Sequence, residues 1–303
     1  MNNIAIRTEG LSRDYGNFRA LDKVDLAIEN SRVVALLGPN GAGKTTFLRL
    51  LMGLLEPTEG KAWILEADSR ALTDQIAARI GYMGDADEPP HWSTIKQLTK
   101  LQAGASREFD REFAKRFLTK RGLSVKGAYG SLSKGQKKWV RAGLVLAGKP
   151  DILLLDEPAE GLDPSARRDL YDEVRDHVTD IDATAIVATH IISDIERIAD
   201  DVAIINHGRI VTYAALEDLR EQVREIQLAE GSRMPEFSNG IEILGSKTAA
   251  GARLVWVRCL DEALRKFKDI SGEKVVIRSV GLETFYLAMT EHSENVNIEV
   301  REK

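Results

Sequence analysis

The chain has 303 residues, enough for about two domains, because a single hydrophobic core usually stops growing near about 250–300 residues. Its 42 Lys and Arg against 47 Asp and Glu give a net charge of −5, which argues against a general nucleic-acid binder. One cysteine, Cys259, excludes a disulfide framework and is expected to be an ordinary core thiol. Because we find no signal peptide and no apolar run of about 18 residues, we expect a soluble chain.

The first segment predicts two strands. Residues 4–8 and 22–28 alternate between apolar and polar side chains, and the turn-rich sequence SRDYGN lies between them. Tyr15 falls in that turn. An exposed aromatic ring at this place can stack on a nucleobase, but a plain loop tyrosine explains the sequence equally well.

Residues 33–51, VVALLGPNGAGKTTFLRLL, are the most informative segment. Five apolar residues predict a buried strand, the next eight match G-x-x-x-x-G-K-[ST], and an apolar helical pattern follows. Glycines let backbone N–H groups approach a polyphosphate, and a helix N-terminus adds partial positive charge. Lys44 can reach the β- and γ-phosphates, and the Thr45 hydroxyl suits Mg²⁺. The segment therefore predicts nucleoside triphosphate binding.

The next stretch alternates between short predicted elements. The helix that follows the glycine-rich loop is expected to end near residue 55, before Pro57. There follow a strand (61–66), a helix (73–79), an apolar strand-like segment (80–83), an acidic, proline-containing loop (84–90) and two helices (about 93–103 and 106–121). The charged face of the last helix is interpreted as a solvated surface.

Ser133 and Gln136 form the pattern S-x-x-Q, which predicts a capping box at the start of a helix that ends near residue 148. Lys134 and Gly135 lie in its first turn. Such a helix N-terminus can bind a second anion, although most capping boxes only cap a helix.

A buried strand at residues 152–155 ends in two carboxylates, Asp156 and Glu157. Carboxylates at the end of a core strand are costly to bury. Combined with the phosphate-binding loop, they are interpreted as a ligand of hydrated Mg²⁺ (Asp156) and as the group that orients or deprotonates the attacking water (Glu157). A strand end that simply meets solvent is the alternative.

The next segments of the chain predict a helix, a core strand and a hairpin. Asp163 and Pro164 predict the N-cap and first residue of a helix whose buried stripe contains Leu170, Val174 and Val178. The core strand 185–189 then places His190 at its carboxyl end, where open α/β sheets bind ligands, so we interpret His190 as a γ-phosphate contact. Residues 202–205 and 209–212 predict a closing hairpin.

The character of the chain changes near residue 223. Four strands are predicted, at about 225–230, 240–245, 252–260 and 274–280, with helices at about 263–270 and 282–289. They predict a small α+β domain with its own core, suited to dimerisation, regulation or a partner contact rather than to catalysis. The polar tail 291–303 is expected to fray.

The order of these pieces, over residues 1–222, resembles the ATP-binding cassette (ABC) ATPases. Residues 132–136, LSKGQ, are similar to the LSGGQ signature of that family, with lysine in the third place, and ILLLDEP follows at the expected distance. The resemblance implies an α/β P-loop NTPase cassette with a RecA-like parallel-sheet core, an antiparallel β subdomain and a helical signature subdomain at about 88–148. The small α+β domain, 223–303, would then be an accessory domain.

The resemblance also implies a set of site residues, with Glu160–Asp163 similar to the D-loop. Lys44, Glu157 and His190, the last as switch histidine, would be catalytic; Thr45, Asp156 and Asp85 would hold Mg²⁺; and ATP would be bound by Tyr15, Gly38, Pro39, Asn40, Gly41, Ala42, Gly43, Lys44, Thr45, Thr46, Ser133, Gly135 and Gln136. Ser133, Gly135 and Gln136 would act on the ATP held by a second copy in a head-to-tail homodimer.

Asp85 departs from the family pattern, which usually has glutamine at this position. Aspartate supplies a hard oxygen ligand for Mg²⁺ but adds a negative charge beside the γ-phosphate. We hypothesise that Asp85 keeps the metal contact and changes turnover or coupling; alternatively, it faces solvent.

The resemblance predicts an ATP-hydrolysing subunit of a bacterial ABC transporter that drives a separate membrane permease, through which it would associate peripherally with the cytoplasmic face of the inner membrane. The closing GLETFYLAMTEH is similar to the extra domain of ABC-2-type exporters, a group that includes drug, antibiotic, sodium, polysaccharide and gliding-related systems. No nucleic-acid partner is expected.

Two other classes are alternatives. A cassette ATPase acting in DNA repair carries long inserted coiled coils, and one acting on the ribosome carries two cassettes, whereas this chain has a short helical insertion and one cassette. A P-loop GTPase or kinase should lack LSKGQ and the following LLLDEP.

Overall fold

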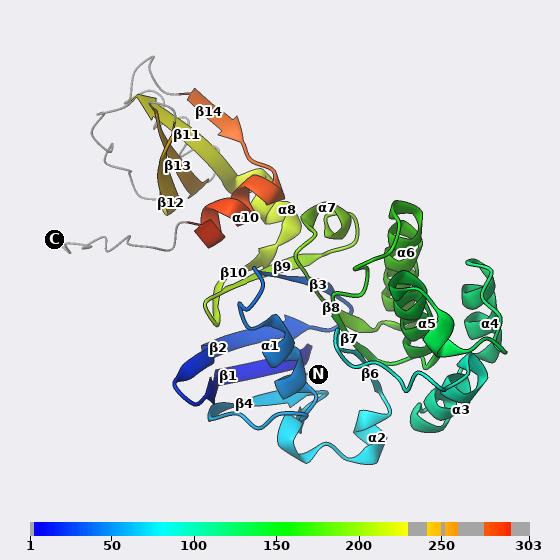
Figure 1. Cartoon of the computed structure of the whole chain (residues 1–303). Coiled ribbons are helices and arrows are strands. Elements are labelled where there is room, and N and C mark those ends of the chain that lie inside the picture. The colour runs from blue at the N-terminus through cyan, green and yellow to red at the C-terminus, as the bar shows by residue number, and fades with distance from the viewer. Residues whose placement is uncertain (1–2, 230–240, 250–251, 260–275, 292–303) are drawn as a thin grey trace. The chain divides into compact units, whose positions relative to one another are not determined.

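The computed structural model describes residues 3–229, 241–249, 252–259 and 276–291 (Figure 1). The chain divides into two compact units, residues 1–213 and 214–303. Two sheets and most of the helices belong to the first unit, and a four-stranded sheet belongs to the second. The functional division into a cassette of residues 1–222 and an accessory domain stays a prediction.

A six-stranded sheet forms the centre of the first unit, in the order β10-β9-β3-β8-β7-β6. Its strands are β3 (Val33–Leu37), β6 (Ile80–Met83), β7 (Ile152–Asp156), β8 (Thr184–Thr189), β9 (Asp201–Asn206) and β10 (Arg209–Ala215). The pairs β3–β8, β3–β9, β6–β7 and β7–β8 are parallel. All residues of β3, β7, β8 and β9 are buried, which explains why the sequence shows uninterrupted apolar runs instead of alternation.

This parallel pairing has a direct consequence for function. Because parallel strands end at the same edge of a sheet, the segments that follow β3, β6, β7 and β8 converge there. These segments are the phosphate-binding loop (residues 38–46), Gly84–Asp85, Glu157 and His190. Residues far apart in the sequence therefore meet at one place.

The antiparallel sheet of the first unit has the order β2-β1-β4-β5. Its strands are β1 (Ile4–Tyr15), β2 (Phe18–Glu29), β4 (Glu59–Ile64) and β5 (Ala67–Asp68). The expected long turn between the first two strands was wrong: β1 continues to Tyr15, so only Gly16 and Asn17 connect it to β2. Gly16 adopts φ +58, a conformation in which glycine avoids the strain of a side chain.

Helix α1 (Lys44–Leu51) packs between the two sheets, and Phe47, Leu48 and Leu50 are fully buried in the core that they share. Helix α1 ends at Leu51, four residues before the predicted helix end near residue 55. Gly53 explains the early stop, since it adopts φ +67 and an added Cβ would lie 2.2 Å from the carbonyl oxygen of Ser69.

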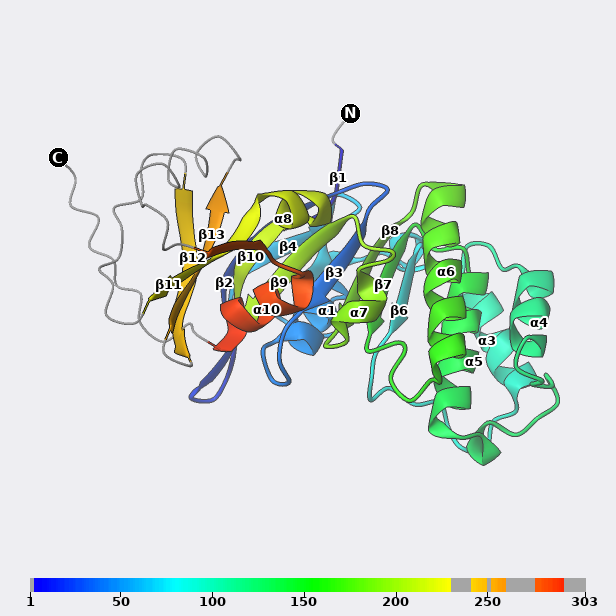
Figure 2. The ribbon, with the colours of Figure 1, turned by 90° about the horizontal axis from the view of Figure 1, so that it is seen from above.

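Helices α3 to α6 form a cluster beyond the β6 edge of the parallel sheet (Figure 2). The helices of the first unit other than α1 are η1 (Ser69–Ala71), α2 (Asp74–Ala77), α3 (Ile95–Ala105), α4 (Arg111–Thr119), η2 (Tyr129–Ser131), α5 (Lys134–Ala147), α6 (Pro164–Ile181) and α7 (Ile192–Ile195). Trp139 of α5 holds α4, because its ring stacks on Phe117 at 4.0 Å and its Nε1 donates to the Phe117 carbonyl oxygen at 2.9 Å.

The second unit contains an antiparallel sheet in the order β12-β13-β11-β14. Its elements are α8 (Leu216–Gln222), β11 (Val223–Ala229), β12 (Ile241–Ala249), β13 (Ala252–Cys259), β14 (Val276–Ser279) and α10 (Leu282–Glu291). Cys259 is a buried member of its core with Ile226, Val255 and Val257, as expected. The helix predicted at about 263–270 and the polar tail lie outside the described residues.

Within the described part of the chain, the structure contains no helix that combines the length and apolarity needed to span a membrane.

Candidate active site

The phosphate-binding loop is built around glycines that have little freedom to change. Gly41 and Gly43 adopt φ +81 and +111, and a Cβ on Gly38 would lie 2.4 Å from the Ile205 carbonyl oxygen. The first turn of α1 follows at once, and its N-cap, Gly43, supplies no side-chain hydrogen bond to the helix. The backbone N–H groups at this helix start are therefore suited to bind an anion.

Lys44 is held by the loop that precedes it. Its Nζ donates to the carbonyl oxygens of Gly38 at 2.6 Å and of Pro39 at 3.2 Å, and lies 3.7 Å from Glu157 Oε1. Burial lowers the pKa of Lys44, although the nearby charges of Glu157 and Asp156 act in the opposite direction. The ammonium is thus positioned inside the loop that a polyphosphate would occupy.

Asp156 and Thr45 form the pair expected of a magnesium site. Thr45 Oγ1 donates to Asp156 Oδ2 at 2.6 Å, and burial raises the pKa of Asp156. Among the described residues, no three His, Cys, Asp or Glu side chains converge on a preformed metal site. This arrangement fits Mg²⁺, which usually takes one or two protein ligands and completes its shell with phosphate oxygens and water.

Glu157 has an unusual backbone and an available oxygen. Its φ of +46 is a left-handed conformation that is rare for residues other than glycine and is typical of functional sites. Its Oε1 bonds His190 Nδ1 at 2.9 Å. Its Oε2 is buried and has no hydrogen-bond partner within the described ranges. A buried carboxylate oxygen without a partner can accept a hydrogen bond from a water molecule.

His190 follows β8 and lies beside Glu157, as its place at the sheet edge suggested. An ionised carboxylate can only accept hydrogen bonds, so the bond to Glu157 requires a proton on Nδ1. The side chain is 46% exposed, which leaves the ring accessible to a ligand.

Lys44, Thr45 and Glu157 line a pocket of about 290 Å³, whereas Asp156 and His190 do not line it. It is lined by Tyr15, Phe18, Ala20, Pro39, Asn40, Gly41, Gly43, Lys44, Thr45, Thr46, Asp85 and Glu157. Sequence reasoning missed Phe18, whose side chain is more exposed than that of Tyr15, 61% against 45%. Its signal was present, because Tyr15 and Phe18 flank a two-residue turn and pair across the strands.

Asp85 lines this pocket, and its Oδ1 lies 2.5 Å from Lys138 Nζ. Burial alone would raise the pKa of Asp85, but the hydrogen bond and charge of Lys138 outweigh it and hold the pKa below its usual value. The metal-ligand role of Asp85 stays a prediction.

The signature residues line a different pocket, of about 380 Å³. Its wall consists of Arg121, Ser133, Gly135, Gln136, Trp139, Gly161, Leu162, Asp163 and Ala166. The predicted capping box is confirmed: Ser133 Oγ accepts from the Gln136 N–H at 3.2 Å, and Gln136 Oε1 accepts from the Ser133 N–H at 3.0 Å. Gly135 packs on the neighbouring loop, where a Cβ would lie 2.4 Å from the Gly161 carbonyl oxygen. The predicted nucleotide-binding residues therefore line two separate pockets, except Gly38 and Ala42, which line neither.

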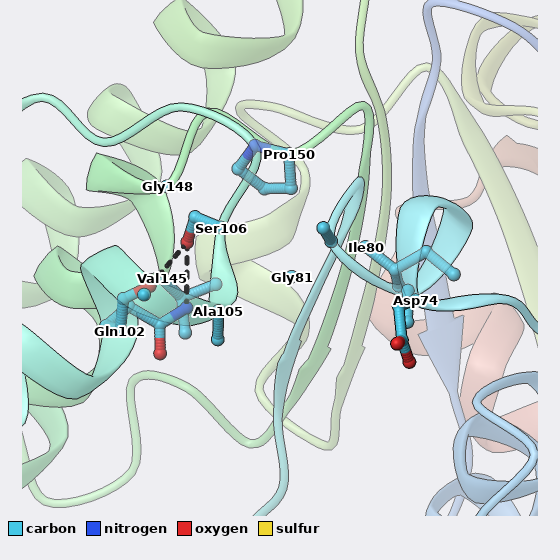
Figure 3. Close-up of a pocket in the computed structure, with 12 residues that line it drawn as sticks. Asp74, Ile80, Gly81, Gln102, Ala105, Ser106, Val145, Gly148 and Pro150 are labelled. Carbon is cyan, nitrogen blue, oxygen red and sulfur yellow. Dashed lines mark hydrogen bonds between the residues drawn. The ribbon is translucent and has the colours of Figure 1, made fainter.

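A third cavity, of about 500 Å³, lies between the β6 edge of the sheet and the helical cluster. Figure 3 shows Asp74, Ile80 and Gly81 on one side, and Gln102, Ser106 and Pro150 among the residues of the opposite wall. Ser106 Oγ donates to the Gln102 carbonyl oxygen at 2.8 Å and so fixes the end of α3. The strand β6 forms part of this wall and leads directly to Asp85.

Comparisons with known proteins identify the family. The profile described as ABC transporter matches residues 21–160. The daunorubicin/doxorubicin resistance ATP-binding protein DrrA of Streptomyces peucetius is 31% identical over 95% of this chain and 93% of its own length. This chain belongs to the ATP-binding proteins of ABC transporters. The daunorubicin resistance ATP-binding protein DrrA2 of Streptomyces coeruleorubidus is 29% identical over 100% of the chain and 99% of its own length.

Solved structures agree with the fold. An ATP-binding subunit of an ABC transporter matches with a TM-score of 0.65 and 25% identity, over 71% of this chain and 92% of its own. A dimeric bacterial ABC transporter cassette matches with a TM-score of 0.63 and 24% identity, over 70% of this chain and 98% of its own. The predicted α/β P-loop cassette is confirmed.

Family membership also establishes the general activity. The chain is an ATPase that binds ATP and serves as the ATP-binding subunit of an ABC transporter. Such subunits dimerise and work with membrane permeases. The relatives give no support to the alternative of a cassette that acts on DNA or the ribosome.

Proposed function

We propose that this subunit powers an exporter, as a homodimer that encloses two ATP molecules with Mg²⁺ and drives a separate membrane permease from the cytoplasmic face of the inner membrane. The observation that carries the proposal is the separation of the two pockets, because Ser133, Gly135 and Gln136 do not line the phosphate pocket of their own chain. Relatives named for daunorubicin resistance, which match along nearly the whole chain, support export.

In the proposed mechanism, Lys44 exchanges its bonds to the loop carbonyl oxygens for bonds to the β- and γ-phosphates of ATP. The loop N–H groups bind the same phosphates. Thr45 and Asp156 would hold Mg²⁺, and the ion would supply charge neutralisation on the phosphates. Asp85 is paired with Lys138 and is left out of this mechanism.

Glu157 orients the attacking water through its unpartnered Oε2 and accepts its proton, while His190 holds Oε1 and contacts the γ-phosphate. The left-handed backbone of Glu157 aims the carboxylate into the pocket instead of along the strand. The Tyr15 ring stacks on the adenine at the mouth of the same pocket.

A second copy completes the site. The N-terminus of α5, with Ser133, Gly135 and Gln136, binds the γ-phosphate held by the partner's phosphate-binding loop. ATP then joins two pockets that are separate within one chain, and hydrolysis releases the two copies.

A Glu157→Gln substitution tests this mechanism. The amide keeps the size of the carboxylate but cannot accept a proton, so we expect ATP hydrolysis to fall by about 10²- to 10⁴-fold while ATP binding persists. With ATP and Mg²⁺, the variant should elute from a size-exclusion column as a dimer. Glu173→Gln, which removes a carboxylate from an ion pair between α6 and Lys120, is the matched control and should hydrolyse ATP at the wild-type rate. A Glu157→Gln variant that stays monomeric with ATP would contradict the mechanism.

We propose that the membrane permease binds at the cavity beside β6. Leu101 of α3, the helix that lines this cavity, is 72% exposed and offers an apolar anchor. A permease bound at this cavity would contact β6, which leads to Asp85. A movement of the permease could therefore be transmitted through β6 to the ATP site.

Leu101→Glu tests this contact in membranes that also contain the membrane protein encoded by a neighbouring gene. Co-purification with that protein should fall, whereas the ATPase rate of the isolated chain should not change. Leu54→Glu is the control, because Leu54 is also exposed (56%) but does not belong to an element that lines the cavity. Equal co-purification of both variants would exclude this surface.

A further inference from the structure

Basic side chains of α5 form hydrogen bonds and ion pairs with the acidic loop that follows β6, residues 84–88 (GDADE). The contacts are Lys137 Nζ to Glu88 Oε2 at 2.9 Å, Lys138 Nζ to Asp85 Oδ1 at 2.5 Å, and the Arg141 guanidinium to the carbonyl oxygens of Gly84 and Asp85. Residues 137 and 141 are one helical turn apart, so these cations extend from neighbouring positions on α5. The loop is thus fixed to the helix that begins at the signature.

Lys138 differs from the other two cations in what else it binds. Its Nζ also donates to the main-chain carbonyl oxygen of Glu157 at 2.7 Å, and its side chain is only 4% exposed. One buried ammonium therefore joins α5, the loop after β6 and the residue that follows β7. A buried cation of this kind is costly unless charged and polar partners surround it.

The charge of Asp85 gives this contact a further effect. Asp85 lines the phosphate pocket, where an unpaired carboxylate would repel the phosphates of ATP. Lys138 cancels that charge at 2.5 Å. The pocket then keeps Lys44 as the cation that faces the phosphates, without a competing free carboxylate at Asp85.

We propose that Lys138 is a positioning residue for ATP hydrolysis, which neutralises Asp85 beside the phosphate site and fixes the main chain of Glu157 through its carbonyl oxygen. This inference rests on the proposed function, because it assumes that Glu157 acts on the attacking water. Lys138 also lies on α5 just beyond the signature residues 132–136, so a shift of α5 is transmitted to Glu157.

A double-mutant cycle tests the role of the charge. We would measure the ATPase kcat and KM of the full-length chain and of Lys138→Gln, Asp85→Asn and the double variant. Lys138→Gln leaves Asp85 unpaired, so we expect kcat/KM to fall about tenfold or more. The double variant replaces the ion pair by a neutral hydrogen-bonded pair, and its kcat/KM should recover to within about threefold of wild type.

Lys137→Gln is the matched control, because Lys137 makes an ion pair with the same loop through Glu88 but neither residue lines the phosphate pocket. Its kcat/KM should stay within about twofold of wild type. A Lys138→Gln variant with wild-type kinetics would overturn the proposal. A defect that Asp85→Asn does not relieve would also overturn it, because a purely structural role of Lys138 predicts no rescue.

Two results separate this inference from the proposed function. A Glu157→Gln variant that hydrolyses ATP at the wild-type rate would refute the proposed function, whereas an inactive Glu157→Gln variant together with unchanged Lys138 variants refutes only this inference. If Lys138→Gln alone does not fold, the double variant decides: near-wild-type kinetics support neutralisation of Asp85, and a folded but inactive double variant overturns it.

Discussion

The phosphate pocket and the signature pocket of the first unit differ in how complete they are. The phosphate pocket contains the buried charges Lys44 and Glu157, which already contact each other and the surrounding loops. At the signature, Ser133 and Gln136 are exposed and bond mainly to each other across the helix start. The first pocket is preorganised by the chain itself, and the second is half of a site that a second copy would complete.

The largest expected effect concerns the preorganised pocket. Lys44→Met keeps the apolar stem of the side chain but removes the ammonium that would contact the β- and γ-phosphates. We expect the affinity for ATP to fall about 10- to 100-fold, since charge-assisted hydrogen bonds contribute about 1.5–3 kcal/mol. Isothermal titration of the full chain with ATP and Mg²⁺ measures this loss.

Lys120→Met is the control for Lys44, because Lys120 makes an ion pair with Glu173 and neither residue lines either pocket. Its ATP affinity should equal that of wild type. Equal affinity of the two variants would show that Lys44 does not bind phosphate.

The next prediction concerns the signature pocket. Ser133→Ala removes the cap of α5 and the hydroxyl proposed to bind the partner's γ-phosphate. Thr94→Ala removes the cap of α3, which has the same capping-box geometry with Gln97 but lies in neither pocket. Both variants should lose about 1 kcal/mol of stability. Only Ser133→Ala should also lower kcat, by about tenfold, while the monomer still binds ATP.

Thermal unfolding and steady-state ATPase rates of the two variants separate capping from catalysis. If Ser133→Ala and Thr94→Ala lose kcat equally, the effect of Ser133 comes from helix stability. The signature pocket would then have no role in binding the partner's nucleotide.

Local patterns predicted much of this molecule. The glycine-rich loop, the capping box at Ser133 and the Asp163 cap of α6 depend on neighbours within a few residues, so their sequence patterns determined their structures. The parallel order of the strands also placed His190 next to Glu157.

Contacts between distant segments could not be predicted in this way. Lys138 and Asp85 are 53 positions apart, and no local pattern in the sequence links them. The left-handed backbone of Glu157 is likewise imposed by the surrounding fold, since no glycine or asparagine indicates it. Phe18 was missed because β1 and β2 extend further toward each other than their alternation suggested.

The two aromatic rings at the mouth of the phosphate pocket can be distinguished by substitution. The Arg13 guanidinium lies 4.8 Å from the centre of the Tyr15 ring and covers one face of it, which orients the other face for a base. We expect Tyr15→Ala to raise the KM for ATP about fivefold, near the lower limit for stacking on a base, and Phe18→Ala to raise it less. A larger effect of Phe18→Ala would assign the stacking ring to Phe18.

The smallest expected effect lies outside both pockets, at His177. This α6 residue is half-buried, and its Nε2 bonds the Pro150 carbonyl oxygen at 2.9 Å, just before β7 begins. Burial lowers the pKa of His177 from its ordinary value of 6.5. The unfolded chain therefore binds a proton more readily than the folded chain, so stability is complete above about pH 6.5 and decreases as the pH falls toward the folded pKa.

His177→Gln keeps a side-chain donor for Pro150 but removes the titration. Between about pH 7.5 and 5.5 the unfolding temperature of wild type should fall more than that of the variant, by on the order of 2 °C. The ATPase rate at pH 7.5 should not change, because His177 lines neither pocket. Parallel pH profiles of the unfolding temperature would mean that His177 binds protons equally in both states. A lowered ATPase rate would instead show that the contact between α6 and Pro150 affects Glu157 through β7, before whose start Pro150 lies.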